Sequence, residues 1–150
     1  MGRVIEILTF NQVLEINRRF QNSGDCLFVG RDNLHNADAL HYILYAVQNL
    51  IFGQDLYPTL FDKAAALGWQ ISTHHVFIDG NKRTSFASAR LTLNLNGYDI
   101  PASPRRIDEE KVALAMRMAR GEVAADEFSD WLRARAFPTT YAIGELAAGE

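Results

Sequence analysis

Apolar residues recur at three- and four-residue steps through most of the chain, which is the pattern of helices that bury one face. The first such stretch begins at Phe10, directly after Thr9, and Gln12 lies three residues beyond Thr9. This spacing predicts a capping box, so we expect a helix that begins here and ends within residues 22–24. Residues 1–8 are expected to form an extended lead-in or a short strand.

Five further segments carry the same helical periodicity. Pro58 suits the first turn of the third helix, and Gly97 is expected to end the fourth in the left-handed conformation. In the fifth helix, Met116 is assigned to the buried side. The sequence therefore predicts one all-α domain over residues 1–150, with about six helices, one short β-hairpin at most, and a weakly structured tail over 138–150. The expected ranges are 32–50, 58–74, 81–96, 107–120 and 125–136.

Composition limits the number of domains, the kinds of partner and the compartment that we expect for this protein. A length of 150 residues suits one hydrophobic core, and the net charge of −3 gives no overall basic footprint for nucleic acid. No apolar run approaches the 18 or so residues of a membrane-spanning helix, and we expect no signal peptide. The single cysteine, Cys26, fits a reducing compartment. We therefore expect a cytoplasmic protein that binds neither membrane nor nucleic acid directly.

A polar loop between the third and fourth predicted helices concentrates the candidate chemistry. Residues 75–84 read His-Val-Phe-Ile-Asp-Gly-Asn-Lys-Arg-Thr and run straight into the fourth helix. The first backbone N–H groups of a helix lack partners within the helix, and the helix dipole favours negative charge there. The junction therefore predicts an anion site, and our hypothesis is that it holds nucleotide phosphates beside His75.

Two residues of this loop suit the chemistry of transfer from ATP to a protein hydroxyl. Histidine is the side chain best tuned to remove a proton near neutral pH, so His75 is the candidate base. The triphosphate of ATP needs a divalent ion, usually Mg²⁺, which one carboxylate and phosphate oxygens often hold. Asp79 is the candidate ligand of this ion.

The next residues suit phosphate binding. Gly80 leaves the backbone donors uncovered, Lys82 supplies a compact charge, and Arg83 supplies a planar fork for bidentate contact. Asn81 either donates its amide to a phosphate oxygen or locks the loop. Thr84 and its neighbour Ser85 either bind phosphate or cap the helix.

Simpler interpretations exist for each residue taken singly. His75 alone is more typical of a structural or surface histidine, Asp79 to Asn81 alone of a turn, and Phe77 of a core anchor. A transition-metal site of His74, His75 and Asp79 is disfavoured, because adjacent helical residues point about 100° apart. A helical binding or regulatory module is the non-enzymatic alternative.

The ten residues resemble the Fic motif, His-x-Phe-x-Asp-Gly-Asn followed by Lys or Gly and then Arg. More specifically, the chain resembles the death-on-curing (Doc) branch of the Fic/Doc superfamily, because residues 9–18, 52–60 and 63–65 are also similar to that branch. The resemblance implies a compact helical bundle in which the third helix, the loop and the fourth helix form the site. It implies that His75, Asp79 and Arg83 are catalytic, with Mg²⁺ on Asp79.

The resemblance also implies partners. The stretch Gln54, Asp55, Leu56 and Tyr57 would correspond to a flap that docks the target by strand addition. The target would be a Ser or Thr hydroxyl of a translation factor similar to elongation factor Tu, and its modification would arrest translation. The chain would be the toxin of a pair whose separate antitoxin binds near the active-site groove.

Two positions bear on which group is transferred. Typical Fic enzymes have Gly at the position of Lys82 and transfer AMP, whereas Lys is common there in the death-on-curing branch. Lys82 therefore favours a kinase that transfers the γ-phosphate of ATP. Gly80 is closer to general Fic sequences, which leaves adenylyl transfer as the alternative.

Overall fold

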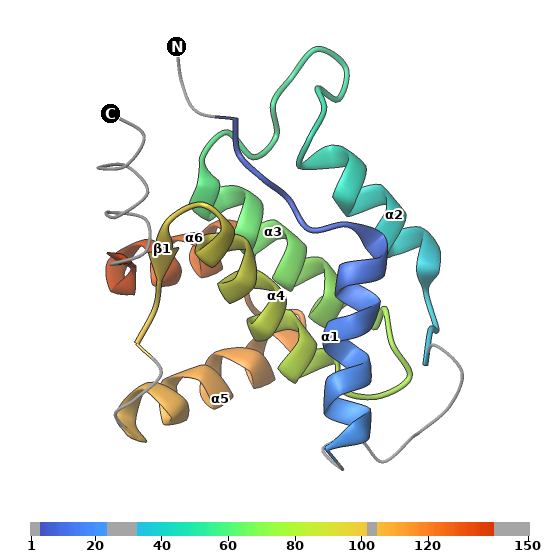
Figure 1. The fold of residues 1–150 in the computed structure, drawn as a ribbon, viewed down its shortest axis with the longest axis vertical. Helices are drawn as coiled ribbons and strands as arrows, with labels where there is room; N and C mark the ends of the chain where they lie inside the picture. The colour runs from blue at the N-terminus through green and yellow to red at the C-terminus, as the bar shows by residue number, and fades with distance from the viewer. Residues whose placement is uncertain (1–3, 24–32, 102–104, 140–150) are drawn as a thin grey trace.

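Six helices make up most of the described chain, which comprises residues 4–23, 33–101 and 105–139 of this computed structural model (Figure 1). Strands β1 (Tyr98–Asp99) and β2 (Phe137–Pro138) add a small antiparallel pair, with Tyr98 opposite Pro138 and Asp99 opposite Phe137. The predicted all-α class with about six helices is confirmed. The helices are α1 (Phe10–Asn22), α2 (Ala37–Ala46), α3 (Leu60–Thr73), α4 (Asn81–Leu95), α5 (Arg105–Ala119) and α6 (Ala125–Arg135).

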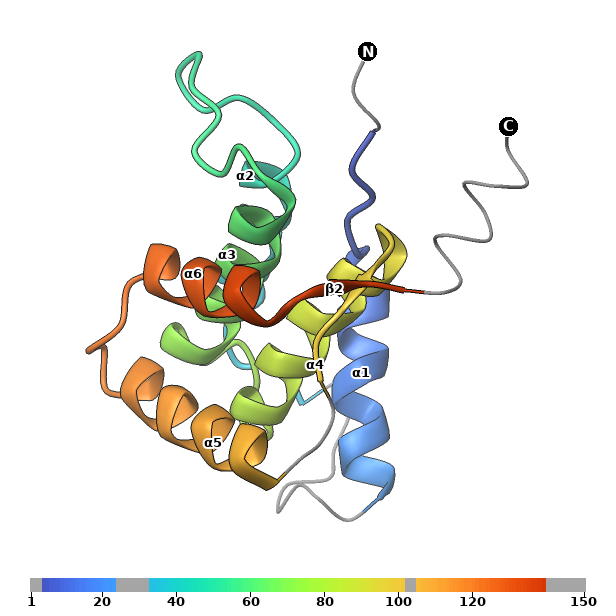
Figure 2. The same ribbon diagram turned by 90° about the vertical axis from the view of Figure 1, so that its left-hand side faces the viewer.

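Helix α3 lies between two hydrophobic clusters. Leu67 and Ile71 join the cluster formed with α1 and α2, whereas Ala64 and Ala65 join the cluster formed with α4, α5 and α6. Figure 2 shows the same arrangement, with α5 and α6 on one side of α3 and α4, and α1 on the other. At Gly68 the backbones of α3 and α4 come so close that an added Cβ would lie 2.9 Å from a carbonyl oxygen of α4. This packing fixes the two helices that flank the predicted site.

Capping boxes set the starts of two helices. The Thr9 side chain accepts a bond from the Gln12 backbone N–H (3.1 Å), and the Gln12 side chain accepts one from the Thr9 N–H (2.8 Å), as predicted. Thr59 and Asp62 form a second box at 3.1 and 3.2 Å. Helix α3 therefore begins at Leu60, two residues later than the predicted start at Pro58.

Helix α2 is shorter than the predicted range of 32–50. The Asn36 side chain accepts a bond from the Ala39 N–H (3.2 Å) and starts the helix at Ala37. At the other end, the amides of Gln48 and Asn49 bond to carbonyls of the last turn (2.6 and 2.9 Å), so the helix does not continue. Asp32, the predicted start, lies outside the described residues.

The remaining expectations have mixed outcomes. The described part of the lead-in is extended and belongs to no strand, and Gly97 has a φ of +89°, as predicted. Met116 is 45% exposed and Met118 is buried instead, so the assignment of Met116 to the core is wrong. Cys26 and the tail beyond residue 139 lie outside the described residues. In the described ranges, no helix has the length and apolar character needed to cross a bilayer.

The ion pair between Arg90 and Asp99 ties α4 to β1 and makes stability depend on pH. Two hydrogen bonds from the guanidinium (2.7 and 3.1 Å) hold the pKa of Asp99 at about 2, against the opposing effect of burial. A lowered pKa means that the folded state favours the charged carboxylate. The stabilisation is therefore complete above the unfolded-state pKa near 3.8 and is lost as the pH falls toward 2.

We expect Asp99→Asn to lower the free energy of unfolding by about 1 kcal/mol at pH 7, since solvent screens this partly exposed pair. The difference between wild type and variant should disappear toward pH 2. Urea denaturation at pH 7, 4 and 3 measures it, and a difference that grows as the pH falls would contradict the assignment.

Candidate functional site

The loop that carries the Fic-like motif connects the end of α3 to the start of α4. Helix α3 ends at Thr73, and His75 then takes a φ of +46°, a left-handed conformation that is uncommon for a residue other than glycine. Gly80 has a φ of +82° and is the N-cap residue of α4. The chain thus turns sharply at both ends of the loop, and strained backbone of this kind concentrates at functional sites.

Segment 33–36 holds the loop from outside. The N–H groups of His35 and Asn36 both donate to the Val76 carbonyl (2.8 and 3.0 Å), and the Ile78 N–H donates to the Asn33 carbonyl (2.8 Å). Leu34 and Phe77 form an isolated antiparallel bridge at the same place. The loop backbone is therefore fixed by hydrogen bonds of the kind that hold sheets together.

Phe77 and Asn81 fix the loop from inside. The Phe77 ring is buried in the cluster shared by α1, α2 and α3, with 1% of the residue exposed, so the core-anchor interpretation is confirmed. The Asn81 side chain accepts a bond from the Phe77 N–H (2.9 Å) and donates one to the Phe77 carbonyl (2.7 Å). Of the two roles predicted for Asn81, the structure therefore contains the one that locks the loop.

Two buried amides that the sequence did not single out hold the backbone of Asp79. The side-chain N–H groups of Asn17 and Asn33 donate to the Asp79 carbonyl at 3.1 and 2.8 Å. The Asn17 oxygen accepts bonds from Asn33 (2.9 Å) and Gln21 (2.8 Å). Asn17 is fully buried on the apolar face of α1, and a polar residue at such a position is the signal that predicts a buried network.

The start of α4 has the character of an anion site. No side chain caps the helix at Gly80, and the Gly80 N–H instead donates to the Asp79 carboxylate (2.8 Å). The first intrahelical bond runs from the Thr84 N–H to the Gly80 carbonyl (2.9 Å), so the N–H groups of the first turn before it have no intrahelical acceptor. Together with the helix dipole, these donors favour a negatively charged group.

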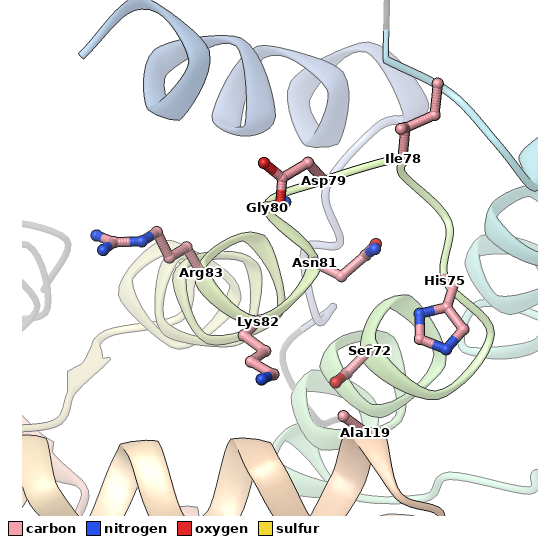
Figure 3. A pocket seen from close by; sticks show the side chains of 9 residues that line it. All are labelled: Ser72, His75, Ile78, Asp79, Gly80, Asn81, Lys82, Arg83 and Ala119. Atoms are coloured by element: carbon pink, nitrogen blue, oxygen red, sulfur yellow. The ribbon is translucent and has the colours of Figure 1, made fainter. Parts of the chain in front are cut away.

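A pocket of about 270 Å³ opens at this junction. Figure 3 shows His75 on one side of it and Lys82 on the first turn of α4, whereas the side chain of Arg83 extends away from His75. Six of the predicted site residues therefore share one pocket, and Ser72, Ile78 and Ala119 complete its wall. The predicted six are His75, Asp79, Gly80, Asn81, Lys82 and Arg83.

Thr84 differs from its predicted role in phosphate binding. Its side chain is fully buried, and its hydroxyl oxygen accepts a bond from the Asn17 amide (3.0 Å). Ser85 also points inward, where its hydroxyl donates to the Gly68 carbonyl (2.7 Å). Both hydroxyls therefore bond to neighbouring helices and stabilise the packing of α4. Arg83 is the last exposed residue before them at the start of the helix.

The predicted docking flap is also misplaced. Gln54, Asp55, Leu56 and Tyr57 precede the start of α3, whereas the pocket lies at its end, about 20 Å further along a helix of 14 residues. Figures 1 and 2 both show the connection between α2 and α3 at the far end of the helix. Gln54 does close a tight turn with Ile51, through bonds of 2.8 and 2.9 Å, but this turn borders no part of the pocket. These residues therefore do not form an edge beside His75.

The transition-metal alternative is not supported by the geometry. The His74 ring packs edge-on against Trp69, with ring centres 5.6 Å apart. Among the described residues, no three His, Cys, Asp or Glu side chains gather closely enough to hold a metal ion between them.

Comparison with known proteins agrees with this geometry. The sequence profile of the Fic/DOC family matches residues 7–93, which include α1 to α4 up to Leu93 and the whole loop. The chain belongs to the Fic/DOC family. The polar loop from His75 to Arg83 lies within the matched range, between α3 and α4.

Two curated relatives belong to the death-on-curing group by name. Toxin Doc of Mycolicibacterium smegmatis is 36% identical over 80 residues, which cover 53% of this chain and 62% of that protein. Protein kinase doc of Escherichia phage P1 is 35% identical over 74 residues, which cover 49% of this chain and 55% of that protein. The chain thus matches less than two thirds of the length of either relative.

The buried amide network makes a testable prediction for stability. We expect Asn17→Leu to lower the free energy of unfolding by about 2–4 kcal/mol, because it leaves the buried partners of Asn17 unpaired. Glu15→Gln, on the exposed side of the same helix, should change it by less than about 0.5 kcal/mol. Urea denaturation measures both variants. Equal effects would show that the network does not stabilise the loop.

Proposed function

We propose that this chain is the toxin of a toxin–antitoxin pair and acts as a protein kinase. It transfers the γ-phosphate of ATP to a Ser or Thr hydroxyl of a translation factor similar to elongation factor Tu. The observation that carries the proposal is the single pocket in which His75, the uncapped start of α4 and Lys82 meet. The names of the two relatives, a toxin and a protein kinase, support the same direction.

In the proposed step, His75 takes the proton of the target hydroxyl as the hydroxyl oxygen bonds to the γ-phosphorus. The bond from that phosphorus to the bridging oxygen breaks, and ADP leaves with the electron pair. Positioning and charge stabilisation supply most of the catalysis in such transfers. His75 suits the base because it is exposed, lines the pocket, and lies on a loop whose backbone is fixed by hydrogen bonds.

The residues present fit a magnesium ion carried with the nucleotide. Asp79 offers a carboxylate to the pocket, and the bond from the Gly80 N–H orients it. Mg²⁺ is commonly held by one or two carboxylates together with phosphate oxygens, which matches this donor set. When bound, the ion would neutralise charge on the phosphates.

Lys82 is the reason to favour the kinase over the adenylyltransferase. It is exposed on the first turn of α4 and lines the pocket from the side opposite His75. A bulky cation at this position fills space and adds positive charge, so it disfavours one of the two possible arrangements of the phosphates. The proposal is therefore that the γ-phosphorus, and not the α-phosphorus, lies next to His75.

A groove beside the pocket supports the proposed antitoxin. It has a volume of about 430 Å³ and combines apolar side chains of α4 and α5 with three cations, Lys82, Arg83 and Lys111. Val112 and Met116 in this groove are 59% and 45% exposed. An amphipathic antitoxin segment with acidic residues matches these apolar side chains and cations, and it would also cover Lys82.

Transfer from labelled ATP tests the proposal. Wild-type protein incubated with ATP labelled on the γ-phosphate, in extract, should label a protein band, and ATP labelled on the α-phosphate should not. His75→Asn should lower the labelling rate at least about 100-fold, because a positioned base contributes about that much or more. Asparagine tolerates the left-handed backbone of residue 75, so this variant should keep the wild-type melting temperature.

Incorporation of label from the α-phosphate would show that the protein transfers AMP, and it would contradict the kinase assignment. An absence of label from either position, or equal labelling by His75→Asn, would contradict the proposed activity.

A further inference from the structure

Ser72 belongs to the pocket lining and carries a buried hydroxyl without a hydrogen-bond partner among the described residues. It lies in the last turn of α3, with 1% of the residue exposed, and its Oγ forms no hydrogen bond within the described part of the chain. It nonetheless lines the same pocket as His75 and Lys82. Leaving a buried hydroxyl unpaired is costly, and a hydroxyl that also lines a pocket can gain its missing partner from a ligand bound there.

Helix geometry explains why Ser72 faces the pocket. Gly68 lies four residues earlier on the same face of α3, where its carbonyl accepts the bond from Ser85 of α4. Ser72 lies one turn further along α3. Because α4 runs antiparallel to α3, the part of α4 that faces Ser72 is its first turn, which begins at Asn81. No earlier turn of α4 covers this face, so Ser72 is part of the pocket lining although only 1% of the residue is exposed.

The surroundings of Ser72 define the chemistry of a ligand. Figure 3 shows its hydroxyl in the pocket with Lys82 on the neighbouring wall of α4 and Ala119 of α5 nearby. Asp79, the acidic residue of the lining, lies beside Gly80 and above Asn81 in this view, whereas Ser72 lies below Asn81. A hydroxyl, an ammonium group and the first N–H groups of α4, which have no acceptor within the helix, all donate hydrogen bonds, so an anionic oxygen suits this end of the pocket.

We propose that Ser72 is a further nucleotide-binding residue, which donates its hydroxyl hydrogen bond to a phosphate oxygen beside Lys82. The inference rests on the proposed function, because it takes the ligand to be a nucleotide. It adds a contact from α3 to a phosphate site otherwise built from α4 and the loop. The phosphate chain is thereby held from both helices that flank His75.

Ser88 provides a matched control for this contact. It is fully buried, its Oγ also lacks a partner among the described residues, and it is not part of the pocket lining. Ser72→Ala and Ser88→Ala therefore remove the same group from two buried positions, one in the pocket lining and one outside it. Neither change should lower the melting temperature without ligand, because neither hydroxyl makes a hydrogen bond in the folded protein.

Binding is measured by isothermal titration calorimetry with a non-hydrolysable ATP analogue and Mg²⁺, and by competition with pyrophosphate and with adenosine. We expect Ser72→Ala to weaken binding of the analogue and of pyrophosphate about tenfold and to leave adenosine unchanged. Ser88→Ala should bind all three like the wild type.

The outcomes separate this inference from the proposed function. A wild type that binds neither analogue nor pyrophosphate overturns the proposed function and the inference with it. A wild type that binds the analogue, together with a Ser72→Ala variant of equal affinity, overturns the role of Ser72 alone. Equal weakening in both variants, or weaker adenosine binding in Ser72→Ala, also overturns the phosphate contact.

Discussion

The two hydrogen bonds between the Asn81 side chain and the Phe77 backbone are the contact on which the site depends. They close the loop on itself while the Phe77 ring sits in the core, so the loop is part of the packed structure. The start of α4 and the left-handed residues His75 and Gly80 are thereby held at fixed positions. A loop fixed in this way places donors before a ligand arrives, which lowers the cost of ordering them on binding.

The same constraint explains the polar interior of the fold. The amides of Asn17 and Asn33 reach the Asp79 carbonyl because α1 and segment 33–36 pack directly against the loop. The hydrogen bonds of the two side-chain amides offset most of the cost of burying them, although Asn33 Oδ1 has no partner among the described residues, and they fix the backbone that carries the Asp79 carboxylate. Helix α1 and segment 33–36 therefore contribute to the site through hydrogen bonds as well as through hydrophobic packing.

The sequence predicts those parts of the fold and of the pocket that depend on residues close together in the chain. Helix periodicity, the Thr9 capping box and Gly97 depend on neighbouring residues, and the pocket residues from His75 to Arg83 are consecutive in the chain apart from core positions such as Phe77. The failures depend on tertiary contacts. The Thr84 side chain is buried because it forms a hydrogen bond with Asn17 of α1. The flap assignment failed because residues 54–57 precede the start of α3, whereas the pocket lies at its end. No local pattern reveals such partners, since they are distant in sequence.

The most direct measurement of the central claim is a titration of the ¹⁵N-labelled protein with a non-hydrolysable ATP analogue and Mg²⁺, followed by amide NMR. If the start of α4 holds the phosphates beside His75, the amide signals of Asn81, Lys82 and Arg83 should shift first and most. Those of residues 54–57, at the far end of α3, should remain in place. Saturable shifts confined to another surface, with the α4 amides unchanged, would contradict the claim.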